Sequence, residues 1–156
     1  MTKSTDSDKT VATNRRARYD YDILDTWECG MVLTGSEVKS LRDSQVVIKD
    51  AYAEIRAGEV WLESMHIAPY VFARDGGHDP ERRRKLLMHR REIDRLEGRI
   101  NEEGLTLVPL KIYFRDGRAK IEIALVRGRR SYDKRQAIRA REQGREMDRA
   151  LREERR

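Results

Sequence analysis

The sequence predicts a mostly β fold, in which about six antiparallel strands close into a small barrel with helical insertions and a basic C-terminal tail. Three observations predict it. Several segments alternate apolar and polar residues with a period of two, which is the pattern of half-buried strands. Short turn signals separate pairs of these segments. The chain of 156 residues is long enough to bury one core, although 40% of its residues are charged.

The N-terminal part predicts a disordered segment followed by a long strand. Residues 1–13 are polar, and we expect them to be disordered. Odd-numbered positions from 19 to 33 are apolar or aromatic, and Asp25 is the one interruption. One face of this strand, including Cys29, should therefore be buried, and the even-numbered face, including Glu28, should meet solvent.

The middle of the chain predicts a short helix and then a hairpin. Gly35–Arg42 has room for one or two helical turns that would bury its apolar residues. Alternating residues run from 51 to 56, the dipeptide Ala57-Gly58 makes a tight turn, and residues 59–67 return as the second strand.

A longer helix is predicted after a flexible loop at residues 75–78. Asp79-Pro80-Glu81 has the character of a helix N-terminus, because Asp caps, Pro fits the first helical position and Glu suits the positive end of the dipole. Residues 81–103 therefore predict one helix, or two helices broken near His89, and Gly104 suits the C-terminus. The apolar stripe of this helix consists of Leu86, Ile93, Leu96 and Ile100.

The last strands predict a second hairpin. Residues 110–114 and 119–125 alternate in polarity, and Asp116-Gly117 between them is a strong hairpin signal. Closing the strands into a barrel would leave no exposed edge, so the pattern favours an OB-type barrel over residues 14–128. An open α+β sheet is the alternative.

Positive charge is concentrated in the C-terminal tail, residues 129–156. The tail has 11 basic and 6 acidic residues, so its formal charge is +5, whereas residues 1–128 carry 23 basic and 22 acidic residues, or +1. A basic tail on a nearly neutral body is typical of a nucleic-acid-binding arm. The alternative is a solvated and partly disordered end.

Catalysis has little support in the residues, and we expect no enzyme activity, cofactor or metal. The histidines are far apart and there is no phosphate-binding loop. Cys29 is the only cysteine and should be a small core residue, which fits a cytoplasmic protein without disulfides, and no apolar run suggests a membrane span. Asp20, Asp22 and Asp25 could hold a metal for phosphodiester hydrolysis, but they more simply belong to the solvent face of a strand.

Binding to a polyanion has better support. One basic cluster contains residues 82–85 with Arg90 and Arg91, and residues 14–19 form a second basic segment. Tyr52 and Tyr113 are predicted on outer faces, where a phenol ring could stack on a base or could be sheltered by neighbouring side chains.

Four motifs occur in a fixed order: Asn-Arg-x-Ala-x-Tyr at 14–19, Glu-Val-Lys-Ser-Leu-Arg at 37–42, Arg-Lys-Leu-Leu at 84–87 and Gly-Arg-Arg-x-Tyr-Asp-Lys-Arg at 128–135. With these motifs the chain resembles the small protein B (SmpB) family, the SsrA-binding proteins of bacterial trans-translation. The resemblance implies a non-catalytic adaptor, monomeric when free, that binds transfer-messenger RNA (tmRNA, or SsrA RNA) and promotes its delivery to stalled ribosomes. The implied partners are tmRNA, the small ribosomal subunit and elongation factor Tu.

The resemblance also implies functional residues. Family residues that bind tmRNA fall on Asn14, Glu28 and Leu87. On a helix Leu87 would lie about 100° from the stripe residue Leu86 and could face outward, or it could be a second core leucine. With the basic residues beside them, the expected RNA-binding set is Asn14, Arg15, Glu28, Arg84, Lys85 and Leu87.

The family's tail motif implies contacts with the ribosomal decoding site and message channel, through Arg129, Arg130, Tyr132, Asp133, Lys134 and Arg135. Tyr132 stands where many members have histidine, and tyrosine does not become cationic near neutral pH. Two other functions stay open from the residues alone. One is an OB-fold ribosome-assembly or ribosomal RNA-binding protein, and the other is a metal-dependent nuclease built on the three aspartates near residue 22.

Overall fold

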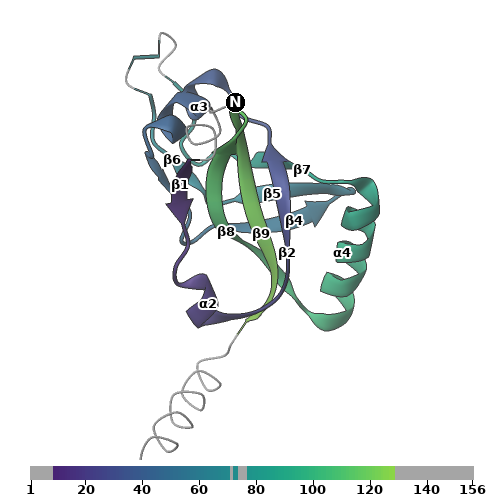
Figure 1. Cartoon of the computed structure of the whole chain (residues 1–156). Coiled ribbons are helices and arrows are strands. Elements are labelled where there is room, and N and C mark those ends of the chain that lie inside the picture. Colours follow the sequence, from purple (N-terminus) through teal and green to yellow (C-terminus); the bar gives the residue numbers. More distant parts are fainter. Residues whose placement is uncertain (1–8, 71, 74–76, 129–156) are drawn as a thin grey trace, which may run out of the picture.

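The structure is a computed structural model that describes residues 9–70, 72–73 and 77–128. Figure 1 shows a β-barrel with the helix α4 along one side and the shorter helices α2 and α3 near opposite ends. The elements in chain order are β1 (Thr10–Thr13), α2 (Ala17–Asp20), β2 (Tyr21–Met31), α3 (Gly35–Arg42), β3 (Val46–Val47), β4 (Tyr52–Arg56), β5 (Glu59–Glu63), β6 (His66–Ile67), β7 (Arg84–Leu87), α4 (Arg90–Glu103), β8 (Thr106–Arg115) and β9 (Arg118–Gly128).

The strands close into a ring. Within the described residues, seven strands form one sheet in the order β1-β8-β4-β5-β7-β2-β9, and β9 pairs again with β8. This second pairing closes six of them into a barrel, and β1 lies outside the ring along β8. The short strands β3 and β6 pair with each other. The predicted mostly β barrel of about six strands is therefore confirmed, and the sheet is not open.

The ring is joined unequally around its circumference. β2 and β9 pair along most of their length, as do β8 and β9. In the described part of the chain, β4 and β8 pair at one position, Ala53 with Leu107. β2 and β7 pair at two positions, Gly30 with Leu87 and Met31 with Leu86. The barrel therefore consists of two well-paired parts, β1-β8-β9-β2 and β4-β5-β7, that meet at two short joints.

A β-bulge in β2 divides the buried side chains into two clusters. The register with β9 skips Leu24 between Ile23 and Asp25, and such an extra residue changes the face on which the following side chains lie. Ile23 packs on a small cluster that includes Ala124 and Val126 of β9, whereas Cys29 belongs to the main core, whose β9 residues lie on the opposite face of that strand. The bulge therefore coincides with the interruption at Asp25 in the sequence pattern.

The N-terminal segment differs from the sequence-based expectation. The prediction that residues 1–13 are disordered is wrong for Thr10–Thr13, which form β1 against β8. Pairing with β8 satisfies the backbone groups of β1, and Val11 and Ala12 are partly buried against the core, so this segment is ordered. The long strand begins at Tyr21, because Ala17–Asp20 forms α2. Residues 1–8 lie outside the described residues.

The predicted helix at residues 81–103 is wrong in its first part. The Asp79 carboxylate does accept the Glu81 N–H at 3.0 Å, but this makes a turn and the chain continues as β7. Leu86 in β7 pairs with Val60 of β5 and with Met31 of β2. Pairing with strands on both sides satisfies the backbone of β7, and this tertiary context outweighs the local helix signal.

The second part of that prediction is confirmed by α4. Its residues Ile93 and Leu96 are buried against the core and Ile100 is partly buried. Gly104 ends the helix in the left-handed conformation, with φ of 64°. Among the described residues, no helix has the length and apolar character needed to cross a membrane.

The short helix and both hairpin turns follow the predictions, but the strand predicted over residues 59–67 is divided into β5 and β6, which belong to different sheets. Ala57-Gly58 and Asp116-Gly117 have positive φ at both positions, as two-residue hairpin turns of type I′ require. Thr34 and Glu37 form a capping box at the start of α3, in which the Thr34 N–H donates to Glu37 Oε1 at 2.8 Å. The same glutamate also takes part in the contacts that fix β7.

Candidate nucleic-acid interface

A groove of about 710 Å³ lies on the outside of the barrel where β2, β7, β9 and the start of α4 meet. Glu28 from β2 and Leu87 from β7 line it, so the fold brings together two of the residues that the sequence predicts as RNA-binding. Other lining side chains are Trp27, Met88, His89, Glu92 and Lys120. A groove with apolar, acidic and basic groups can contact the base, the sugar and the phosphate of a nucleotide.

Leu87 projects outward because β7 is a strand. Its neighbours Arg84 and Leu86 are buried, and Leu87 is 52% exposed, as the alternation of a strand requires. Gly30 lies opposite it on β2, and a Cβ there would come within 3.3 Å of the Leu87 Cδ1. The prediction that Leu87 faces outward is correct, but its reason is strand alternation and not rotation around a helix.

Glu28 is on the outer face, as its position in the strand predicts, and its carboxylate accepts hydrogen bonds from two side chains. Its Oε2 accepts a hydrogen bond from the Tyr113 hydroxyl and a charge-assisted one from Arg115 Nη1, both on β8. The side chain keeps 35% exposure. The carboxylate is therefore fixed in orientation and still reachable by a ligand.

Tyr113 is on the predicted outer face but does not offer its ring to a base. It is 7% exposed, because Lys111 and Arg115 lie over the ring with their charged groups 5.3 and 5.2 Å from its centroid. Burial and the hydrogen bond to Glu28 raise the pKa of the Tyr113 hydroxyl, so it stays a donor. Tyr52, in contrast, is 38% exposed.

Lys120 is a groove residue that the candidate set lacks. It lies on β9 opposite both Gly30 of β2 and Tyr113 of β8, which puts a cation between the strand that carries Glu28 and the strand that carries its hydrogen-bond donors. The sequence contains a signal for it, because Lys120 falls on the solvent-facing positions of the last hairpin. Its ammonium group suits a phosphate beside the groove.

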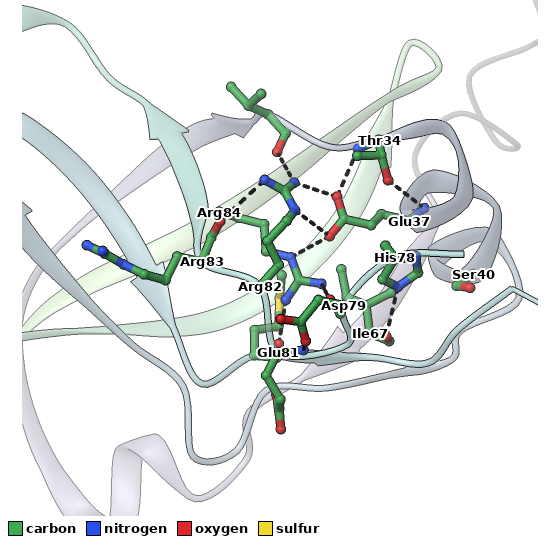
Figure 2. Close-up of polar contacts among 12 residues, drawn as sticks. Thr34, Glu37, Ser40, Ile67, His78, Asp79, Glu81, Arg82, Arg83 and Arg84 are labelled. Carbon is green, nitrogen blue, oxygen red and sulfur yellow. Dashed lines mark hydrogen bonds and ion pairs between the residues drawn. The ribbon is translucent and has the colours of Figure 1, made fainter. Parts of the chain in front are cut away.

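A buried ionic cluster fixes β7 next to this groove. Figure 2 shows the guanidinium groups of Arg82 and Arg84 converging on the carboxylate of Glu37 from α3. Arg84 Nε donates to Glu37 Oε2 at 2.6 Å and its Nη1 donates to the Met65 carbonyl at 2.6 Å. Arg82 Nη2 donates to Glu37 Oε1 at 2.6 Å. The cluster thereby joins β7 to α3 and to the segment between β5 and β6.

The expected phosphate contact of Arg84 is therefore wrong. Its side chain and that of Glu37 are both 0% exposed, so the guanidinium serves the ion pair and no RNA can reach it. Burial raises the pKa of Glu37, but hydrogen bonds from Arg82, the Thr34 N–H and Arg84 outweigh burial and lower that pKa to about 2. Burial lowers the pKa of Arg84 and Glu37 opposes that shift, so the pair is ionised at neutral pH.

The other basic residues at 82–85 also have acidic partners. Arg83 Nε lies 2.6 Å from Glu63, and its guanidinium stands 5.3 Å from the Trp61 ring centroid. Lys85 pairs with Glu59 and its side chain is 38% exposed. Of the two basic residues expected here to bind RNA, Lys85 alone is at the surface, so it keeps that role as a prediction.

Asn14 and Arg15 lie apart from the groove. Asn14 is 8% exposed, and its Nδ2 donates to the Pro109 carbonyl at 3.1 Å while its N–H donates to the Leu110 carbonyl at 2.7 Å. These bonds tie the end of β1 to β8. Asn14 lines a separate hollow of about 300 Å³ with Lys49 and Tyr52, and Arg15 beside it is exposed.

The sites considered for catalysis do not come together. Cys29 is 1% exposed, as predicted, and burial together with the charges of Glu92 and Glu28 raises the pKa of its thiol to about 12. In residues 9–70, 72–73 and 77–128, no three His, Cys, Asp or Glu side chains are close enough together to hold a metal ion. Asp20, Asp22 and Asp25 therefore form no such group.

The tail residues expected to act at the ribosome, Arg129, Arg130, Tyr132, Asp133, Lys134 and Arg135, lie outside the described residues.

Comparison with known proteins identifies the family. The family model described as "SmpB protein" matches residues 11–153. The SsrA-binding protein of Thermobifida fusca (strain YX) is 57% identical over 147 residues, which are 94% of this chain and 92% of that protein. The SsrA-binding protein of Anaeromyxobacter dehalogenans (strain 2CP-C) is 58% identical over 145 residues, 93% of this chain and 89% of its own.

A solved structure agrees with these relatives. It is described as "tmRNA-SmpB: a journey to the center of the bacterial ribosome", and its chain is 48% identical with a TM-score of 0.66 over 82% of this chain and 94% of that one. Sequence motifs, barrel topology and relatives at more than half identity over nearly the whole length lead to one conclusion: the chain belongs to the SmpB family.

Proposed function

We propose that this protein is a non-catalytic adaptor that binds tmRNA and promotes its delivery to stalled ribosomes in trans-translation. The observation that carries the proposal is the groove in which Glu28, Leu87 and Lys120 meet. The relatives' name, SsrA-binding protein, and the tmRNA–SmpB description of the similar solved structure support the same ligand.

The groove chemistry suits unpaired nucleotides of a folded RNA. Leu87 offers an exposed apolar surface to the face of a base, and Lys120 offers a cation to a phosphate. Glu28 repels phosphate, so it accepts hydrogen bonds from base or sugar donors. Such a combination favours a structured RNA that presents one nucleotide correctly over a uniform duplex.

The remaining parts of the proposal concern partners. The barrel would act as a monomer in the cytoplasm and accompany tmRNA with elongation factor Tu to the small ribosomal subunit. The basic tail would then enter the decoding centre and message channel, where Lys134 and Arg135 contact phosphate and Tyr132 stacks. The formal charge of +5 in residues 129–156 supports this assignment to ribosomal RNA.

The test is recovery of the protein from its host with its bound RNA, followed by sequencing. The expected result is one dominant structured RNA, tmRNA. A broad ribosomal RNA profile without tmRNA would instead support a ribosome-assembly protein and would refute the adaptor.

The groove is tested with a pair of exposed apolar residues. Leu87→Ala should lower tmRNA affinity by about tenfold, because it removes apolar contact surface and full burial of a leucine side chain is worth about 1.5–3 kcal/mol. Val47→Ala is the matched control, because Val47 is 49% exposed on β3 and does not line the groove. Equal affinities for the two variants would contradict the assigned surface.

A further inference from the structure

The contact between Glu28 and β8 combines a hydrogen bond from a tyrosine with an ion pair to an arginine. β9 lies between β2 and β8 in the sheet, so the Glu28 side chain reaches across β9 to meet Tyr113 and Arg115. Each of the two donors constrains the carboxylate differently, because the tyrosine is buried and the arginine is 53% exposed.

The two donors share one oxygen. Both hydrogen bonds end on Oε2 of Glu28, and within the described part of the chain no donor bonds to Oε1. Glu28 also lines the groove. One oxygen is thus fixed by the protein, and the other is able to accept a hydrogen bond from a ligand.

Without these donors the carboxylate would be poorly oriented. Glu122 is directly opposite Glu28 in the β2–β9 register, and like charges at such positions repel. Glu92 adds a second carboxylate at the groove. A glutamate side chain that is free to rotate loses conformational entropy when it binds, so holding it in advance favours binding.

The Tyr113 ring is itself held in place. The backbone of Tyr113 pairs with Thr10 of β1 on one side and with Lys120 of β9 on the other. Lys111 and Arg115 cover the ring face. The hydroxyl therefore has a fixed position from which to orient Glu28.

We propose that Tyr113 and Arg115 are positioning residues, which hold Oε2 of Glu28 so that Oε1 accepts a hydrogen bond from an amino, imino or 2′-hydroxyl donor of tmRNA. This inference rests on the proposed function and adds to it the chemistry of one contact. A carboxylate carries no donor and repels phosphate, so the RNA group at this point must be a base edge or a ribose hydroxyl.

The experiment is a double-mutant cycle on the full-length protein, with full-length tmRNA as the probe at one fixed salt concentration. Tyr113→Phe and Arg115→Gln are each measured in the wild-type and in the Glu28→Ala background. In the wild-type background, Tyr113→Phe should weaken binding about fivefold, because one hydrogen bond to a charged acceptor is lost. In the Glu28→Ala background the same change should stay within about twofold.

Two control variants separate positioning from charge and from general loss of a hydroxyl. Arg118 lies opposite Arg115 at the hairpin and has no ion pair among the described residues, so Arg118→Gln removes the same charge without touching Glu28. Its effect on affinity should be equal in both backgrounds. Tyr70→Phe removes the hydroxyl of a tyrosine that contacts Phe72 and Lys39 and does not line the groove, so it should leave tmRNA affinity unchanged.

The outcomes are distinct. Equal losses from Tyr113→Phe and Arg115→Gln in both backgrounds, or no loss in either, would overturn the positioning role, because a merely structural effect is independent of Glu28. Thermal unfolding of each variant checks the fold, and if Tyr113→Phe fails to fold, the exposed Arg115→Gln decides the matter. A wild-type protein that does not bind tmRNA would instead overturn the proposed function, and this assignment with it.

Discussion

The role of Arg84 depends on a partner that is distant in the sequence. Its partner Glu37 is 47 positions away in the chain, and together they anchor the strand that ends at Leu87. Removing one member of such a pair leaves a buried charge unpaired and costs about 3–5 kcal/mol. The ion pair therefore acts on the groove through the position of β7, without contacting any ligand.

The buried pair predicts a pH dependence of stability. The pKa of Glu37 is lowered from 4.5 to about 2, so the folded state gains stability above the unfolded pKa and loses it as the pH falls from about 5 towards 2. Urea unfolding between pH 7 and pH 2.5 should show this decline. In Glu37→Gln the decline should be smaller, whereas Glu54→Gln, which removes an exposed pair with Arg56, should keep it. Parallel curves for all three proteins would refute the assignment.

The buried thiol gives a second prediction for a single residue. Cys29→Ser should lower the free energy of unfolding by about 1–3 kcal/mol, because the hydroxyl enters an apolar core. Affinity for tmRNA should change little in the folded protein, since the side chain faces away from the groove. Chemical denaturation measures the first effect and direct binding the second. An unaltered stability would contradict the burial of Cys29.

Single residues also mark the limit of what the sequence predicts. The outward face of Glu28 follows from strand alternation, which is local, and the structure confirms it. The sequence also predicts an outward Leu87, but from rotation around a helix, whereas the structural reason is alternation in the strand β7. The burial of Arg84 cannot be predicted from the local pattern, because four basic residues in a row look like a surface patch until the position of Glu37 is known. The partners of Glu28 on β8 are equally hidden, since they lie 85 and 87 positions away.

At the scale of elements, the local sequence predicts hairpin turns correctly, but it does not predict a strand whose hydrogen-bond partners are distant in the sequence. The hairpin turns at Ala57-Gly58 and Asp116-Gly117 form as predicted because their geometry is decided by two residues. β7 is missed because β2 and β5 provide its hydrogen bonds, and neither is visible from the helix-like start at Asp79.

Helix α4 offers a prediction with an internal control. Gly98 has helical geometry with no atom within 4 Å of an added Cβ, so Gly98→Ala should stabilise the protein by about 0.5–1 kcal/mol through helix propensity. Gly104 has φ of 64°, so Gly104→Ala should destabilise by about 1 kcal/mol or more. Urea unfolding of the two variants should show opposite signs. The same sign for both would contradict the assigned end of α4.

At the scale of the whole molecule, the net charge is distributed unequally between the barrel and the tail. Residues 1–128 are nearly neutral and, under the proposed function, would bind through shape and a few oriented groups, whereas residues 129–156 carry almost all of the net charge. A neutral barrel favours a selective contact, and a basic arm favours RNA of any sequence. The proposed two RNA partners correspond to these two kinds of surface.

Truncation after Gly128 tests this division. The shortened protein should keep specific binding to tmRNA but lose peptide tagging on stalled ribosomes in a reconstituted translation assay. Charge reversal at Lys134 and Arg135 in the full-length chain should have nearly the same effect on tagging. Full tagging activity from the truncated protein would demonstrate a dispensable solubilising tail and refute the ribosomal role.

The unequal strand pairing around the ring affects where the barrel opens locally. β2 and β7 share two residue pairs, and the groove with Glu28 on one strand and Leu87 on the other spans that joint. Local opening is therefore expected at this joint, and amide hydrogens near Gly30 and Lys85 should exchange with deuterium sooner than those of the β2–β9 ladder. An RNA held by both strands would link them from outside and slow this exchange. The ligand would then complete a barrel that the chain alone closes only loosely at this joint.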